Sequence, residues 1–175
     1  MPSAGYHAVA KVLHWLTAIC VIGLIAVGLW MTDLPISLLK LKLYGWHKWI
    51  GLSVLVLALL RLGWRWHALP PPLPGSVLAW QRRVAPVSHG ILLVLLLALP
   101  ISGWLMSSAG GVTVYWFGYL KLPDVVPRDP HLFETLRQLH HVLAFALIAA
   151  LAVHVLAVLH HDVVRRDGIF RRMWF

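Results

Sequence analysis

Four apolar runs divide the chain, and each is long enough to cross the hydrocarbon core of a bilayer. They cover about residues 12–31, 44–64, 84–106 and 136–159. A helix rises about 1.5 Å per residue, so about 20 apolar residues span a core about 30 Å thick. Within lipid, a single span satisfies its own backbone hydrogen bonds only as a helix. The sequence therefore predicts an all-α integral membrane protein, a four-helix bundle.

The low share of charged residues agrees with this prediction. Only 12% of the 175 residues are charged, whereas a soluble domain has about 25%. Four spans of about 20 residues use roughly half of the chain, which leaves short loops and no separate soluble domain. We therefore expect one transmembrane domain over residues 1–175.

Charge predicts how the bundle is oriented. The chain has 15 Lys and Arg against 6 Asp and Glu, and the basic residues lie at the ends of the apolar runs. Topology and lipid headgroups explain them better than nucleic acid does. The more basic side carries Lys11, Arg61, Arg65, Arg82, Arg83, Arg165, Arg166, Arg171 and Arg172. The other side carries Lys40, Lys42, Lys48, Lys121, Arg128 and Arg137. The first side, with both termini, is expected in the cytoplasm.

Cysteine usage excludes several kinds of site. Cys20 is the single cysteine, and the sequence contains no CxxC or CxxCH motif. Any haem must therefore be bound non-covalently. The first run also lacks the short apolar segment and cleavage site of a signal peptide, so we expect it to be retained as an anchor.

Two histidines in the fourth run lie on the same face of the predicted helix. His140 and His154 are fourteen residues apart, which at about 100° per residue places them within about 40° of one face and about 21 Å apart. His141 falls on roughly the opposite side. Histidine inside a bilayer is costly unless it has a partner, and a bound metal is one such partner. The spacing predicts one imidazole ligand near each membrane surface.

Histidines on other helices lie at the same membrane depths as His140 and His154, and each could be the second ligand of a haem. His47 lies about one turn into the second run from the outside, at the depth of His140. His14 lies about one turn into the first run from the inside, at the depth of His154. We therefore predict two bis-histidine haem b sites, His47 with His140 and His14 with His154, held between facing helices.

The other histidines are less suited to be haem ligands. His89 is expected either to ligate in place of His14 or, more readily, to support a haem propionate. His161 is expected to face a propionate or a quinone headgroup, or to be an ordinary interfacial histidine. The remaining histidines are expected in water or among headgroups: His7, His67, His131, His141 and His160.

Two other classes of protein fit less well. Structural zinc needs four ligands at short spacings, usually with cysteine, whereas these histidines are spread over separate helices. A transporter would show inverted repeats and broken helices near the midplane. Pro100 is instead expected to kink the third helix, with Gly103 as a point of close helix approach.

The ordered set of residues across four helices resembles a known family. It comprises His14-Trp15, Trp46-His47, His89 with Ala98-Leu99-Pro100 and Gly103, and His140 with His154. This pattern is similar to the bacterial cytochrome b561 family, and within it to the superoxide oxidase type. The resemblance extends over nearly the whole chain and includes His160-His161.

The resemblance implies a multi-pass di-haem protein of the bacterial inner membrane, with His14, His47, His140 and His154 as axial ligands. It implies oxidation of superoxide at the outer face and electron transfer through both haems to ubiquinone. Lys40, Lys42, Lys48 and Arg137, with Lys121 and Arg128, are then expected either to steer the superoxide anion or to meet lipid phosphates. The alternative is an electron-transfer subunit that links quinol or quinone to a dehydrogenase or a periplasmic redox protein.

Overall fold

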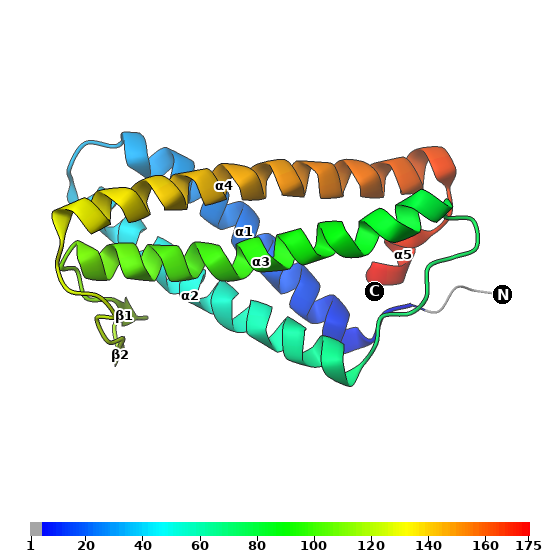
Figure 1. Ribbon diagram of the computed structural model, residues 1–175, viewed down its shortest axis with the longest axis horizontal. Helices are drawn as coiled ribbons and strands as arrows, with labels where there is room; N and C mark the ends of the chain where they lie inside the picture. The colour runs from blue at the N-terminus through cyan, green and yellow to red at the C-terminus, as the bar shows by residue number, and fades with distance from the viewer. Residues whose placement is uncertain (1–4) are drawn as a thin grey trace.

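The computed structural model describes residues 5–175, which form four long helices joined by loops (Figure 1). These are α1 (Ala8–Asp33), α2 (Leu38–His67), α3 (Ala79–Ala109) and α4 (Pro130–Leu159). Each is long and apolar enough to cross a membrane. The predicted helical architecture with four candidate membrane spans is confirmed, although the chain also contains two short β-strands.

Smaller elements lie between and after these helices. They are β1 (Tyr115–Trp116), β2 (Leu120–Lys121), the π-helical turn η1 (His160–Arg165) and α5 (Ile169–Met173). The two strands form an antiparallel hairpin. Phe117 and Gly118 at its tip both have positive φ, at 50° and 80°, as a type I′ turn requires. The sequence predicted only a loop here, because strands of two residues leave no readable alternation.

Helices α2 and α4 each begin six residues before the apolar run that predicted them. Their first turns mix charged or polar residues with apolar ones, and side chains satisfy free N–H groups there. The Ser37 hydroxyl accepts from the backbone N–H of Lys40, and the Asp129 carboxylate accepts from two N–H groups at the start of α4. Such caps stabilise a helix end without apolar residues, so hydropathy alone placed these ends too late.

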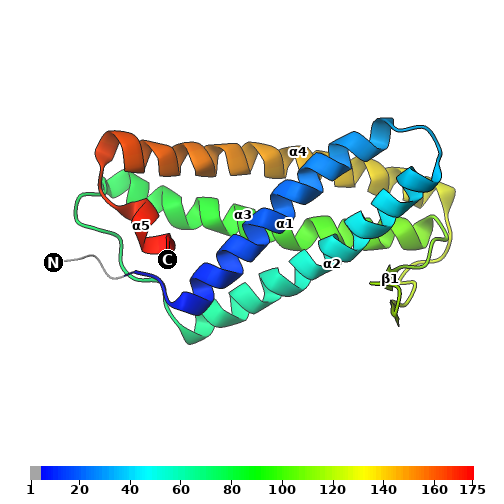
Figure 2. The same ribbon diagram turned by 180° about the vertical axis from the view of Figure 1, so that it is seen from behind.

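The bundle has two distinct ends. Helix α1 packs on α2, α2 on α3, and α3 on α4. Figure 1 and Figure 2 show α3 and α4 side by side along the long axis. The β-hairpin lies at one end, here named the hairpin end, while α5 and the C-terminus lie at the other, the terminal end.

Positions that face the bundle interior recur every seven residues on each of the four helices. The central layer consists of Val21, Val54, Leu96 and Leu147. The hairpin layer consists of Gly28, His47, Gly103 and His140. The terminal layer consists of His14, Arg61, His89 and His154. Seven residues return a helix to within about 20° of the same face, so a single register stacks all three layers. The central side chains are 2% to 8% exposed and separate the two polar layers.

The chain folds back after α4 and covers the terminal end. Arg172 is only 4% exposed, and its guanidinium donates to the carbonyl oxygens of Pro71 and Pro72 at 3.1 and 2.9 Å. The indole N–H of Trp15 donates to the carbonyl of Met173 at 3.0 Å. The sequence predicted only a basic tail after the fourth helix. The structure instead buries one arginine of this tail against the loop between α2 and α3, here named the proline-rich loop, which contains Pro70, Pro71, Pro72 and Pro74.

Candidate functional site

Two pairs of histidines face one another across the bundle. The ring centres of His47 and His140 are 6.4 Å apart, and those of His14 and His154 are 6.3 Å apart. An imidazole nitrogen binds a transition metal at about 2 Å, and the ring centre lies about 1 Å behind it, so rings on opposite sides of one metal are centred about 6 Å apart. Both separations fit bis-histidine ligation of one metal. The structure brings together the same pairs that helical phase and depth predicted.

The hairpin layer lines a cavity of about 770 Å³. All four residues of that layer contribute to its walls, and all four residues of the central layer contribute to its floor. Cofactor sites commonly measure about 300–1,000 Å³ and are largely apolar with few polar groups. Lys48, Arg137 and His141 also line this cavity. The prediction that His141 lies on roughly the opposite side of the helix was wrong, because consecutive residues are only about 100° apart and both can border one wide cavity. Its size and its facing imidazoles fit a haem.

Two glycines make room for the histidine rings of the hairpin layer. A Cβ atom on Gly28 would lie 3.2 Å from Cε1 of His47, and one on Gly103 would lie 3.3 Å from Cε1 of His140. Each ring therefore packs directly against the backbone of a neighbouring helix. Gly103 was predicted as a point of close approach. Gly28 was missed, although it lies fourteen residues after His14 and in register with it.

A buried serine orients His140. The Ser102 hydroxyl, in a residue only 3% exposed, donates to the carbonyl of Leu99 at 2.8 Å. Its oxygen lies 2.9 Å from Nδ1 of His140 and accepts the Nδ1–H, because its own hydrogen is already used. This tautomer leaves the Nε2 lone pair of His140 free for a metal. Sequence reasoning missed Ser102, since its partner lies on another helix.

His47 has no equivalent support. Its Nδ1 is buried, and no hydrogen-bond partner for it is found among residues 5–175. A buried polar atom of this kind is where a bound ion, water or cofactor is expected. Ligation of a metal through Nδ1 would give this nitrogen a partner, whereas ligation through Nε2 would leave it without one.

The terminal layer is more crowded. The ring of His89 is centred 5.5 Å from that of His154, closer than the two pairs that match ligation. His89 therefore fits a supporting role better than a place across a metal from His154. Nη2 of Arg61 lies 3.4 Å from Nδ1 of His14. A guanidinium only donates, so ligation through Nε2 of His14 requires Arg61 to turn away from Nδ1. Sequence reasoning counted Arg61 only as an interfacial charge.

His161 has a partner that sequence reasoning missed. Its Nδ1 lies 2.5 Å from Oδ2 of Asp167, and the two side chains are 12% and 2% exposed. Arg166 and Gly168 both have positive φ, at 51° and 74°, and the resulting bend turns Asp167 back toward η1. The expected contact of His161 with a quinone or a propionate stays a prediction.

The predicted steering residues differ in how free they are. Nζ of Lys40 donates to the carbonyls of Thr32 and Leu34, at 3.2 and 2.6 Å, and so ties α2 to the end of α1. Arg137 pairs with Glu134 at 2.6 Å. Lys42 is exposed and Lys48 half-buried, and Lys48 is the one that lines the cavity without a carboxylate partner among the described residues.

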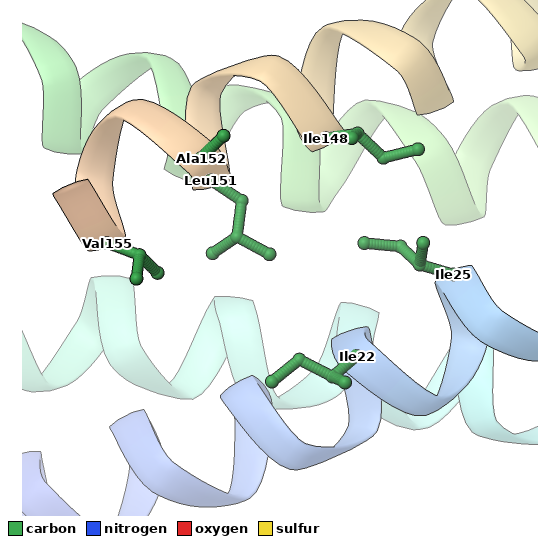
Figure 3. A pocket seen from close by; sticks show the side chains of 6 residues that line it. All are labelled: Ile22, Ile25, Ile148, Leu151, Ala152 and Val155. Carbon is green, nitrogen blue, oxygen red and sulfur yellow. The ribbon is translucent and has the colours of Figure 1, made fainter.

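A second, smaller hollow lies between α1 and α4 (Figure 3). It measures about 350 Å³ and is lined by Ile22, Ile25, Ile148, Leu151, Ala152 and Val155. Two of these residues, Ile25 and Ile148, also line the larger cavity. This apolar hollow therefore adjoins the cavity of the hairpin layer.

Several known proteins are similar to this chain in sequence. A family model described as prokaryotic cytochrome b561 matches residues 5–175. The chain is 32% identical to cytochrome b561 homolog 2 of Escherichia coli (strain K12), over 96% of this chain and 90% of that protein. It is 26% identical to cytochrome b561 homolog 1 of the same strain, over 92% of each. It is 30% identical to the probable superoxide oxidase CybB of Yersinia pestis, over 73% of this chain and 74% of that protein.

Proposed function

This chain belongs to the prokaryotic cytochrome b561 family, and on that premise we propose that it is a di-haem superoxide:ubiquinone oxidoreductase. As a member of this family it is a multi-pass membrane protein of bacterial electron transfer. Beyond family membership, we propose an electron donor, an electron acceptor and a direction of electron transfer. Superoxide is oxidised at the hairpin end, on the outer face of the inner membrane, and ubiquinone is reduced at the terminal end.

Family membership implies haem b, and the proposal assigns two such groups. His47 and His140 hold one, and His14 and His154 hold the other, as the ring separations of 6.4 and 6.3 Å support. Bound haem supplies one-electron transfer. A group held by two histidines in this way would leave no position for a substrate on the iron, so it would supply electron transfer alone.

The central layer keeps the two sites apart. Fourteen helical residues separate His140 from His154, which corresponds to about 21 Å. The side chains between them are apolar, so water and ions are excluded from the bundle centre. An electron then crosses the membrane without movement of a charged side chain, which would be costly in lipid.

Cationic side chains at the hairpin end support an anionic substrate. Lys48 and Arg137 line the hairpin cavity, and Lys42 is exposed on the same helix as Lys48. Positive charge around a cleft raises the local concentration of an anion and its rate of encounter. The likeness to a probable superoxide oxidase also supports this substrate.

The reaction balances over two turnovers of the donor. Each of two superoxide anions gives up one electron and leaves as oxygen, and one ubiquinone takes up two electrons and two protons. We place the quinone headgroup near His161, because this histidine lies one heptad beyond His154 and is paired with the buried Asp167. Protons would reach that site from the cytoplasm.

The single observation that carries the proposal is that two stacked layers each hold a facing pair of histidines, with ring centres 6.4 and 6.3 Å apart. A rapid-mixing experiment with the purified, oxidised protein tests the function. Superoxide should reduce a b-type α-band quickly, at a rate that falls with ionic strength, and a short-chain ubiquinone should then reoxidise it. Prior addition of a superoxide dismutase should abolish the reduction.

A matched pair of variants sharpens this test. Lys48→Gln should lower the superoxide rate by roughly tenfold and flatten its salt dependence. Arg83→Gln, which removes one exposed charge near the other end of the bundle, should leave the rate unchanged. If superoxide leaves the haems oxidised, the chain is instead an electron-transfer subunit for another redox partner. A purified protein without a b-type spectrum would exclude both.

A further inference from the structure

We propose that the site at the hairpin end has a lower reduction potential than the site at the terminal end, because Ser102 and Arg61 bias the two sites in opposite directions. The inference rests on the proposed function for its two haem sites. It adds a driving force for electrons to move from the hairpin end to the terminal end.

The two sites occupy equivalent positions in the bundle, so a difference in their potentials must come from the side chains that differ between them. Each has two facing imidazoles, with ring centres 6.4 and 6.3 Å apart, and each lies against the same apolar central layer. The other two positions differ. The hairpin layer has Gly28 and Gly103 there, which carry no polar side chain, whereas the terminal layer has Arg61 and His89.

Ser102 acts on the hairpin site through His140. Its oxygen accepts the Nδ1–H of His140 at 2.9 Å, while its own hydrogen is held by the Leu99 carbonyl at 2.8 Å. A hydrogen-bond acceptor at the far nitrogen of a ligating imidazole raises the basicity of the ligand. A more basic ligand stabilises ferric iron more than ferrous iron. Ser102 therefore lowers the potential of the hairpin site.

Arg61 acts on the terminal site through its charge. Its guanidinium lies 3.4 Å from Nδ1 of His14, and Arg65 follows one turn later on the same helix. Among the described residues neither arginine forms an ion pair with a carboxylate. A nearby positive charge disfavours the more positive oxidation state of the iron, whichever group the guanidinium contacts, and by most where the dielectric is low. Arg61 therefore raises the potential of the terminal site.

Lys48 lines the hairpin cavity and opposes this difference, but the guanidinium of Arg61 lies against the ring of His14 itself. The effects of Ser102 and Arg61 favour the same direction of transfer. When one electron leaves the hairpin site, that site is oxidised and the terminal site is reduced by one electron. The hairpin site is then ready for the next superoxide, while the terminal site holds the electron for ubiquinone. The asymmetry of the two layers thus accounts for a one-way path between otherwise similar sites.

Potentiometric titration of the α-band tests the inference without any substrate. The parent should show two one-electron waves, and the wave lost in His47→Ala identifies the hairpin site. Ser102→Ala should raise that wave only. If the hydrogen bond favours the oxidised over the reduced site about tenfold, the rise is about 59 mV for one electron. Arg61→Gln should lower the other wave only, so that each substitution narrows the gap.

Conservative and matched variants separate tuning from folding. Ser102→Thr retains the hydroxyl and Arg61→Lys retains the charge, and each should restore the parental wave. Ser108→Ala removes another buried hydroxyl from α3, one that donates to the Trp104 carbonyl, and should change neither wave. Arg83→Gln removes a charge away from the layers and should also change neither.

Every outcome decides the inference. Selective loss of the hairpin haem in Ser102→Ala, with retention in Ser102→Thr, would also support a role for the hydroxyl. Loss of that haem in both variants would overturn it in favour of packing. A hairpin wave above the terminal wave, or unchanged waves in both single variants, would overturn it as well. Haems that titrate as described but resist superoxide would refute the proposed function and leave this inference standing.

Discussion

Three histidines of the two layers differ in the hydrogen bonding of their Nδ1 atoms. Nδ1 of His140 donates to a serine, Nδ1 of His14 accepts from an arginine, and Nδ1 of His47 has no partner among the described residues. A buried polar group without a partner costs about 1–3 kcal/mol. Ligation through Nδ1 would remove this cost at His47, whereas ligation through Nε2 would not.

Removing one ligand from each layer should remove one haem at a time. His47→Ala should lose the hairpin haem and His154→Ala the terminal haem, since each leaves a single imidazole at its site. Haem content should fall by half in each variant, as measured by the pyridine haemochrome spectrum. His131→Ala removes an exposed histidine in the first turn of α4, away from the cavity, and should keep both haems. Full haem content in both ligand variants would contradict the pairing.

Helical phase was enough to find the facing histidines, because periodicity determines which residues of one helix share a face. It did not find Ser102, Arg61 or Asp167. Each of these acts on a histidine through a contact between helices or across a bend. Such a contact depends on the rotation of one helix against another, which the pattern within a single helix does not contain.

At the scale of elements, the four helices followed from hydropathy, whereas their ends and the segments between them did not. Polar caps extend α2 and α4 beyond the apolar runs. The hairpin is anchored by the indole N–H of Trp116, which donates to the Trp49 carbonyl at 3.2 Å and lies 3.3 Å from the Ser53 hydroxyl. These features depend on individual hydrogen bonds, which hydropathy averaged over a run of residues does not detect.

The buried guanidinium of Arg172 should hold α5 onto the terminal end. Arg172→Ala leaves two proline carbonyls without their donor, at a cost of about 1–3 kcal/mol, and should release the segment after η1. Trypsin should then cleave after Arg165 or Arg166 faster than in the parent, as followed by mass spectrometry. Arg171→Ala changes the exposed neighbour and serves as the control. Equal cleavage rates in the two variants would show that Arg172 does not hold the segment.

At the scale of the whole molecule, the two ends differ in what they present. The hairpin end offers an open cavity with Lys48 beside it, and the terminal end is covered by α5 and the proline-rich loop. The cavity lies beside the facing histidines of the hairpin layer, while the smaller apolar hollow of Figure 3 lies between α1 and α4.

The charge asymmetry predicts that the terminal end is cytoplasmic. A green fluorescent protein fused after Phe175 should therefore fluoresce, and alkaline phosphatase at the same position should be inactive. Phosphatase inserted after Leu122, in the loop beyond the hairpin, should be active because that enzyme matures outside the cytoplasm. The opposite pattern of activities would reverse the proposed direction of electron transfer.

The seven-residue register of the three layers also limits how such a chain can change in length. One residue inserted between two layers turns every later position on that helix by about 100°, which would move a histidine from the bundle interior to the lipid face. Insertions and deletions are therefore tolerable in the proline-rich loop, around the hairpin and in the tail, but not between the layers. Lineages of such a protein should diverge in length at their loops while the distances between their histidines stay the same.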